Sequence, residues 1–135
     1  MILYCFKVKF AKLDIFIASS VKGIVRVGIV WIDRNIDVFD YFKKFFPFET
    51  LTVDRLRNLT FIVELKNLLL GKKDVKIRLD VSFSPFQFKV MNAIKRIPFG
   101  KTYTYKDVAF MINKPSAYRA VGQALKRNPL PIIFP

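Results

Sequence analysis

Helix caps and prolines divide the last fifty residues at close spacing, and this division most constrains the fold. Ser84-Pro85 is typical of a helix start, because serine caps a helix and proline is favoured at its first position. That helix is expected to run to Arg96 and to be followed by a turn over Ile97–Gly100. Thr104 then predicts the cap of a short helix over Tyr105–Ile112.

A second short helix follows after about four residues. Asn113-Lys114-Pro115 breaks the first, and Ser116 is expected to cap a helix over Ala117–Arg127. Asn128-Pro129 ends it. Two short capped helices at this separation predict a helix-turn-helix.

The start of the second helix carries unusually small side chains. Ala117, Ala120 and Gly122 would let the backbone approach a narrow groove, with Arg119 as the one long side chain. Major-groove readers normally carry long polar side chains instead. Tight helix packing, with Arg119 a solvated surface residue, explains the same spacing equally well. In either case Ala120, Val121, Ala124 and Leu125 are expected to pack inward.

Charge favours a polyanionic partner. The chain has 135 residues and a net charge of +14. Residues 85–135 carry nine basic side chains and one acidic one, Asp107, so this part is the expected anion binder. Nucleic acid is the first interpretation, an anionic membrane surface the second, and a solubility charge on an apolar protein the third.

The N-terminal part alternates apolar and polar residues in three runs, Ile2–Phe10, Leu13–Ala18 and Gly23–Trp31. Such alternation with short connections predicts an antiparallel meander. Helical spacing predicts a helix over Asp37–Phe46 and a longer, largely buried helix over Val53–Leu70.

The region between the two parts gives weaker signals. Gly71 is expected to end the long helix. Asp74–Val81 could be an edge strand or an extended connector, and Ser82–Ser84 is the expected boundary. The sequence therefore predicts an α+β chain with an N-terminal sheet domain over 1–83 and a helical domain over 84–135.

The chain has one cysteine, Cys5, and no histidine. A disulfide framework and a Cys/His metal site are both excluded within these residues. Cys5 is expected to be a small buried residue. The longest apolar stretch, Ile24–Ile32, is too short to cross a bilayer, and Met1–Lys12 is not a secretory signal. We therefore expect an intracellular, cytoplasmic protein.

Five segments occur in an order and at spacings that resemble a known family: Pro85-Phe86-Gln87, Ile97–Thr102, Thr104-Tyr105, Pro115–Gly122 and Asn128–Pro135. Together they resemble the methylated-DNA–protein-cysteine methyltransferases, also called alkylguanine-DNA alkyltransferases. The resemblance covers residues 84–135 and is specific, because the spacings agree as well as the residues. It implies a ribonuclease-H-like domain over 1–83, followed by a winged-helix or helix-turn-helix DNA-binding domain.

The resemblance also implies roles for single residues. The helix from Ala117 would enter the minor groove, and Arg119 would replace the flipped guanine in the base stack. Tyr105 would press on the phosphate beside the target nucleotide and hydrogen-bond the flipped base. Asn128 would brace the turn that carries the acceptor. Tyr105 as a core aromatic and Asn128 as a helix C-cap are the structural alternatives.

The expected DNA contacts extend around these positions, to Lys101, Thr102, Tyr105, Ala117, Tyr118, Arg119, Ala120, Gly122 and Gln123. Tyr118 departs from the family, which usually has a small residue there. Its ring could stack on a base or sugar, or could clash in the groove.

The acceptor is the second departure. In the family Cys-His-Arg-Val follows the final proline, whereas this sequence stops at Pro135. A split gene with a second polypeptide supplying Cys-His-Arg, an intein, or a truncated sequence would each explain this. Cys5 has no histidine to activate it. We expect no alkyl transfer by this chain alone.

The function implied is DNA repair of O6-alkylguanine by base flipping and a single-turnover transfer to cysteine. The expected partner is duplex DNA containing alkylated guanine, with no membrane, no cofactor and no metal. The alternative is a non-catalytic DNA-binding protein, either an alkyltransferase-like damage sensor or a helix-turn-helix regulator.

Overall fold

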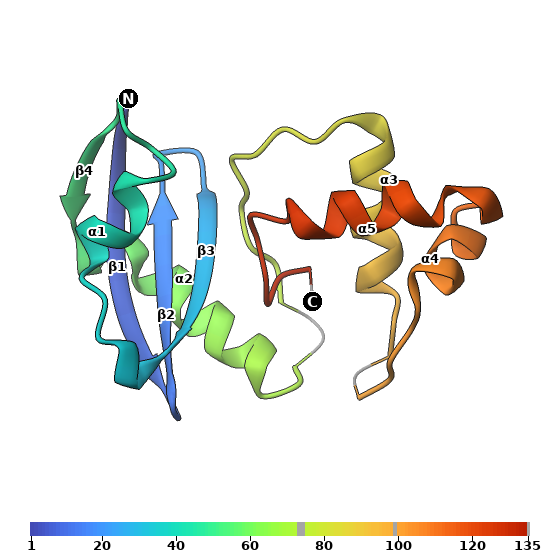
Figure 1. Cartoon of the computed structure of the whole chain (residues 1–135). Coiled ribbons are helices and arrows are strands. Elements are labelled where there is room, and N and C mark those ends of the chain that lie inside the picture. Colours follow the sequence, from blue (N-terminus) through green and yellow to red (C-terminus); the bar gives the residue numbers. More distant parts are fainter. Residues whose placement is uncertain (73–74, 99, 135) are drawn as a thin grey trace. The chain divides into compact units, whose positions relative to one another are not determined.

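The structure, a computed structural model, describes residues 1–72, 75–98 and 100–134. They form two compact units (Figure 1). The first comprises Met1–Val81 with Pro129–Ile132, and the second comprises Ser82–Asn128 with the residues from Ile133 on. Asp74, Phe99 and Pro135, which belong to predicted segments, lie outside the described residues.

The first unit is built on a four-stranded sheet in the order β3-β2-β1-β4. The antiparallel meander is confirmed as β1 (Ile2–Phe10), β2 (Leu13–Ser19) and β3 (Ile24–Trp31). The sequence did not reveal β4 (Thr50–Val53), which pairs parallel to β1. Only four residues long, β4 is defined by pairing with a distant segment rather than by its own pattern.

One face of this sheet is covered by α1 (Val38–Lys43), as Figure 1 shows. The helix is shorter than predicted at both ends. Asp37 is its cap and accepts hydrogen bonds from the amides of Phe39 and Asp40, and the helix ends at Lys43, before the predicted Phe46. A 3-10 turn, η1 (Ile32–Arg34), precedes it. Buried apolar side chains form the core between α1 and the sheet: Leu3, Cys5, Phe16, Ala18, Val38 and Phe42.

The other face packs on α2 (Arg55–Leu69). Val53 belongs to β4, so the predicted start was wrong; Asp54 caps the helix by accepting from the Arg57 amide at 2.9 Å. The expectation of a largely buried helix was also wrong, since its buried residues are Asn58, Phe61, Ile62 and Leu65. Leu56 is 79% exposed. Apolar residues on several sides do not ensure burial when only one side meets the sheet.

Asn58 connects α2 to the sheet through its side chain. Its Oδ1 accepts a hydrogen bond from the Ser19 hydroxyl at 2.7 Å, and its Nδ2 donates to the Tyr4 carbonyl at 3.1 Å. A fully buried amide is tolerated because these partners satisfy it. Gly71 follows the helix with φ of 84°, as predicted for a glycine that ends a helix.

The described part of the predicted 74–81 segment is an extended connector. It pairs with the sheet at one point, where the Ile24 amide donates to the Arg78 carbonyl and the Asp80 amide donates to the Ile24 carbonyl. The later Pro129 also meets this edge, because its carbonyl accepts from the Val27 amide at 2.8 Å. These bonds partly cover the exposed edge of β3.

The second unit is helical where it is described. Its elements are α3 (Pro85–Lys95), α4 (Tyr105–Met111), η2 (Pro115–Ala117) and α5 (Tyr118–Lys126). Their shared core consists of Val90, Met91, Ala93, Ile94, Val108, Ala109, Ile112, Val121 and Ala124. The α+β class with a C-terminal helical part is confirmed. No helix among the described residues is both long and apolar enough to cross a membrane.

Candidate nucleic-acid interface

A reciprocal cap fixes the start of α4. The Thr104 hydroxyl accepts a hydrogen bond from the Asp107 amide at 3.1 Å, and the Asp107 carboxylate accepts from the Thr104 amide at 2.8 Å. Tyr105 is therefore held as the first helical residue, and its side chain is 49% exposed. Lys101 and Thr102, in the segment before this cap, are exposed as well.

The start of α5 differs from the prediction. Pro115 opens the 3-10 turn, in which the Ala117 amide donates to the Lys114 carbonyl at 2.9 Å. Ser116 lies inside this turn, so the residue before α5 is Ala117, which offers no side-chain cap. The predicted Ser116 cap and the start at Ala117 were wrong, because proline begins the turn one residue before the serine.

The two sides of α5 differ sharply. Val121, Gly122 and Ala124 are buried, whereas Arg119, Ala120 and Gln123 are exposed. The inward packing expected for Ala120 was wrong, since the helix turns it to the outer side with Gln123 three residues later. Near the start of the helix the exposed side thus combines the small Ala120 with the long cation Arg119, and Lys126 is exposed at its end.

At Gly122 the side chain of Tyr105 from α4 lies close against the backbone of α5. A Cβ built on it would lie 3.0 Å from Cε2 and 3.2 Å from Cδ2 of the Tyr105 ring. Glycine therefore allows the ring to lie directly against α5. The structure brings Tyr105 together with a residue of the helix that also carries Arg119.

A second contact joins the same two helices. The Lys106 ammonium lies 5.3 Å from the centroid of the Tyr118 ring. Lys106 was not among the predicted site residues, because nothing in a linear sequence shows that residues twelve positions apart meet across a turn. Its only signal was its position next to Tyr105.

Asn128 lies directly after the last helix. Its amide nitrogen donates to the Phe134 carbonyl at 2.7 Å, and its backbone amide donates to the Leu125 carbonyl at 3.2 Å. The C-cap of α5 is Arg127 rather than Asn128. The side chain of Asn128 thus ties the end of the helix to the chain just before Pro135.

The Phe134 ring is held by two further side chains that sequence reasoning missed. Phe83 meets it edge-on, with ring centroids 5.9 Å apart, and the Lys95 ammonium lies 5.4 Å from its centroid. Phe134 itself is only 6% exposed. The segment leading to Pro135 is therefore anchored by a hydrogen bond, an aromatic contact and a cation–π contact.

Comparison with known proteins identifies the family to which these residues belong. The family model "6-O-methylguanine DNA methyltransferase, DNA binding domain" matches residues 85–135. The inducible methylated-DNA–protein-cysteine methyltransferase of Bacillus subtilis is 37% identical over 135 residues, covering 98% of this chain and 74% of that protein. The chain belongs to the methylated-DNA–protein-cysteine methyltransferase family.

Other methyltransferases of the family match mainly the C-terminal part. The protein of Methanosarcina barkeri is 56% identical over 50 residues, which are 37% of this chain and 32% of that protein. Among solved structures, the O6-methylguanine methyltransferase of Mycobacterium tuberculosis has a TM-score of 0.70 at 21% identity, covering 98% of this chain and 75% of that one. The OGT of the same organism in complex with DNA gives 0.69 at 21%, covering 100% and 75%. At such identities the likeness establishes the fold.

The name of the family specifies a protein cysteine as the alkyl acceptor, and Cys5 is not suited to that role. Its side chain is fully buried in the first unit, and burial raises its pKa from 9.0 to about 11. The thiolate, which is the nucleophilic form, is therefore scarce at neutral pH. The described residues also contain no group of three metal-ligating side chains.

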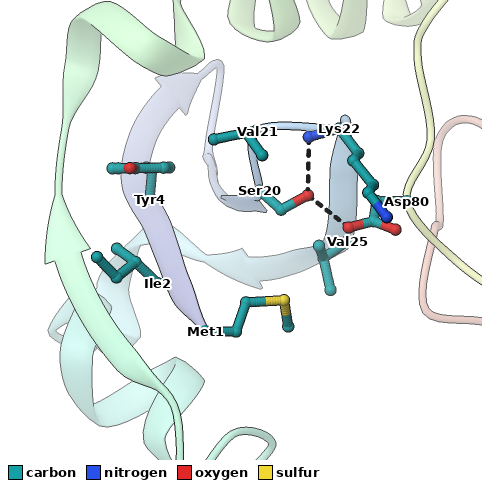
Figure 2. A pocket seen from close by; sticks show the side chains of 8 residues that line it. All are labelled: Met1, Ile2, Tyr4, Ser20, Val21, Lys22, Val25 and Asp80. Atoms are coloured by element: carbon teal, nitrogen blue, oxygen red, sulfur yellow. Dashed lines mark hydrogen bonds between the residues drawn. The ribbon is translucent and has the colours of Figure 1, made fainter.

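The first unit of this methyltransferase chain contains a hollow of about 470 Å³, which Figure 2 shows. The Ser20 hydroxyl donates to the Asp80 carboxylate and accepts from the Lys22 amide. Apolar side chains make up most of the rest of the lining: Met1, Ile2, Tyr4, Val21 and Val25. The predicted DNA-binding residues are elsewhere in the chain, and we assign this hollow no role.

Proposed function

We propose that this chain is the DNA-binding body of a protein that repairs O6-alkylguanine by flipping the base and transferring its alkyl group to a cysteine. In this proposal residues 1–83 are a ribonuclease-H-like domain and residues 84–135 the helix-turn-helix domain. The protein acts on duplex DNA containing alkylated guanine, in the cytoplasm and without a cofactor.

One observation carries the proposal. The exposed side of α5 presents Arg119, the small Ala120 and Gln123, while Tyr105 lies against the same helix at Gly122. Small side chains allow a helix to approach the minor groove closely, and one long cation can then enter the stack. Ala117 and Tyr118 would contact DNA at the start of this helix. Lys101 and Thr102, which precede α4, would contact the DNA backbone.

The energetics are consistent with such a site. Extruding a base costs on the order of a few kcal/mol in lost pairing and stacking. The guanidinium of Arg119 would restore part of the stacking, and the surrounding basic residues would gain by releasing counterions from phosphates. Tyr105 would press on the phosphate beside the target and hydrogen-bond the flipped guanine.

Asn128 has a supporting role in this proposal. Its hydrogen bond to the Phe134 carbonyl holds the chain that leads to Pro135. Since Cys5 is buried, the acceptor has to be a cysteine outside these 135 residues. We propose that it belongs directly after Pro135, in the same polypeptide or in a partner that supplies Cys-His-Arg.

The test is a binding titration with two duplexes that differ only at one base, O6-methylguanine or guanine, at several salt concentrations. We expect binding to both, tighter binding to the alkylated duplex, and a steep decrease in affinity with salt. Incubation of these 135 residues with the alkylated duplex should add no methyl group to the protein mass. Equal affinity for the two duplexes would contradict recognition of the lesion.

The burial of Cys5 is equally compatible with a second candidate, a damage sensor or helix-turn-helix regulator that binds DNA without transfer. The two are separated by completing the chain with the residue that follows Pro135 in the native gene. A cysteine there, with uptake of one methyl group, supports repair. Another residue, with retained preference for the lesion, supports sensing, whereas preference for one base sequence supports a regulator.

A further inference from the structure

Tyr118 and Lys106 form a pair at the start of the two helices of the proposed interface. Lys106 is the second residue of α4 and Tyr118 the first of α5. The ammonium lies 5.3 Å from the ring centroid, within the range of an attractive cation–π contact. Tyr118 is half-buried and Lys106 is exposed.

The helix geometry explains why the Tyr118 ring turns toward α4. Tyr118 and Gly122 are four residues apart, so they share one side of α5. Gly122 meets Tyr105 of α4, and Tyr118 meets Lys106, the next residue of α4. Arg119 and Gln123 are exposed on a different side. The bulky Tyr118 ring, which stands where the resemblance implies a small residue, therefore contacts Lys106 of the same chain.

The Lys106 charge has no carboxylate partner. Where the structure describes the chain, no acidic oxygen lies within 4.0 Å of its ammonium in an ion pair. The neighbouring Asp107 carboxylate instead accepts from the Thr104 amide. A cation–π contact orients an ammonium without neutralising it, so the full charge remains available to an anion.

We propose that Lys106 binds a backbone phosphate of the DNA and that Tyr118 is a positioning residue that holds its ammonium at the start of α5. The inference rests on the proposed function, because the phosphate is that of the duplex bound by α5. Lysine binds phosphate as a point charge and has four rotatable bonds, so a ring that restricts its position lowers the ordering cost of binding. Tyr118 then acts beside the groove instead of filling it.

The experiment measures affinity for a short unmodified duplex as a function of salt for the full chain and its variants. Lys106→Met keeps most of the side-chain length, removes the charge, and should lower the slope of log affinity against log salt by about one. Tyr118→Leu should weaken binding about two- to fivefold, since it removes a cation–π contact of an exposed cation. Tyr118→Phe retains the ring and should bind as the wild type does.

The double variant separates positioning from direct contact. In the Lys106→Met background, Tyr118→Leu should have no further effect. Lys12→Met removes the same charge from an exposed loop of the first unit and should leave the slope unchanged. Thermal unfolding of each variant identifies any loss of binding that comes from loss of structure.

Two results would overturn the inference while leaving the proposed function intact. Equal weakening by Tyr118→Leu in the wild-type and Lys106→Met backgrounds would mean that the ring touches DNA itself. An unchanged salt slope in Lys106→Met would mean that Lys106 meets no phosphate. A wild-type chain that binds no duplex would overturn the proposed function and this inference together.

Discussion

The ring of Tyr105 lies against Gly122 so closely that a Cβ at position 122 would come within 3.0 Å of ring atom Cε2. This contact fixes where the exposed edge of the ring stands relative to the helix that carries Arg119. The position of Tyr105, a proposed DNA contact, therefore depends on a glycine that itself has no side chain to contact DNA.

Gly122→Ala should separate stability from function. Alanine favours a helix interior over glycine by about 1 kcal/mol, and the half-exposed Tyr105 ring can shift to make room. Urea unfolding should therefore show equal or greater stability than in the wild type. The displaced ring should lose its hydrogen bond to the flipped guanine, which lowers affinity for an O6-methylguanine duplex about two- to tenfold.

The control for this prediction is the same change in a Tyr105→Leu background. There Gly122→Ala should leave the affinity for the alkylated duplex unchanged, because no ring remains to be displaced. Loss of affinity in both backgrounds would show that the added methyl group disturbs the DNA contact directly, and the role given to the contact would be wrong.

Arg119→Ala should remove the preference for the alkylated duplex more than it removes general affinity. Arg119 is exposed, so the free energy of unfolding should change by less than about 0.5 kcal/mol. A fluorescent base analogue beside the lesion reports on the flipped state during the titration. Arg127→Ala, the same change at the end of the same helix, should preserve the preference. An equal decrease for both duplexes in Arg119→Ala would reduce Arg119 to a phosphate contact.

Asn128→Asp should loosen the segment that leads to Pro135. The aspartate has nearly the same shape but cannot donate to the Phe134 carbonyl, which now accepts at 2.7 Å. We expect a stability loss of about 1 kcal/mol and faster hydrogen exchange at residues 132–134, measured by mass spectrometry. Asn128→Ala should have a similar effect. Wild-type exchange in the aspartate variant would show that another contact holds this segment.

Cys5 should make stability fall at alkaline pH. Burial raises its pKa to about 11 in the folded chain, so between pH 9 and 11 the thiol ionises in the unfolded state first. The contribution of the buried thiol to the free energy of unfolding is fully present below pH 9 and is lost as the pH rises through 11. Between these values the free energy of unfolding falls by about 1 kcal/mol per pH unit. Urea unfolding of the wild type should therefore weaken with pH more than that of Cys5→Ala. If the stability of the wild type and of Cys5→Ala changed with pH in the same way, the raised pKa of a buried Cys5 thiol would be contradicted.

Local signals predicted much of this fold because they act over a few residues. Ser84 and Thr104 cap their helices as expected, each in a reciprocal pair with the third residue of the helix. The prediction that Ser116 caps a helix was wrong, because Pro115 also favours the start of a helix and begins a 3-10 turn one residue earlier. A single-residue rule cannot decide between two neighbouring starts.

Contacts between helices and strands that are distant in the chain could not be predicted from the sequence. The pairing of β4 with β1, and of Tyr105 with Gly122, is set by how whole elements pack. The sequence explained Gly122 by close approach of the backbone to a groove, whereas the structure buries Gly122 and explains the glycine by the 3.0 Å approach of the Tyr105 ring. Lys106 entered the site only through its contact with the Tyr118 ring.

The central claim, that the exposed side of α5 enters the minor groove, can be measured with a tethered cleavage reagent. Cys5→Ala removes the native thiol, and Ala120→Cys on the exposed side of α5 then carries an iron chelate that generates hydroxyl radicals. Radicals released in the minor groove cut both strands with the cuts offset toward the 3′ ends. We predict that pattern around the O6-methylguanine. Cuts offset toward the 5′ ends, or no cuts from this position while the duplex is bound, would contradict it.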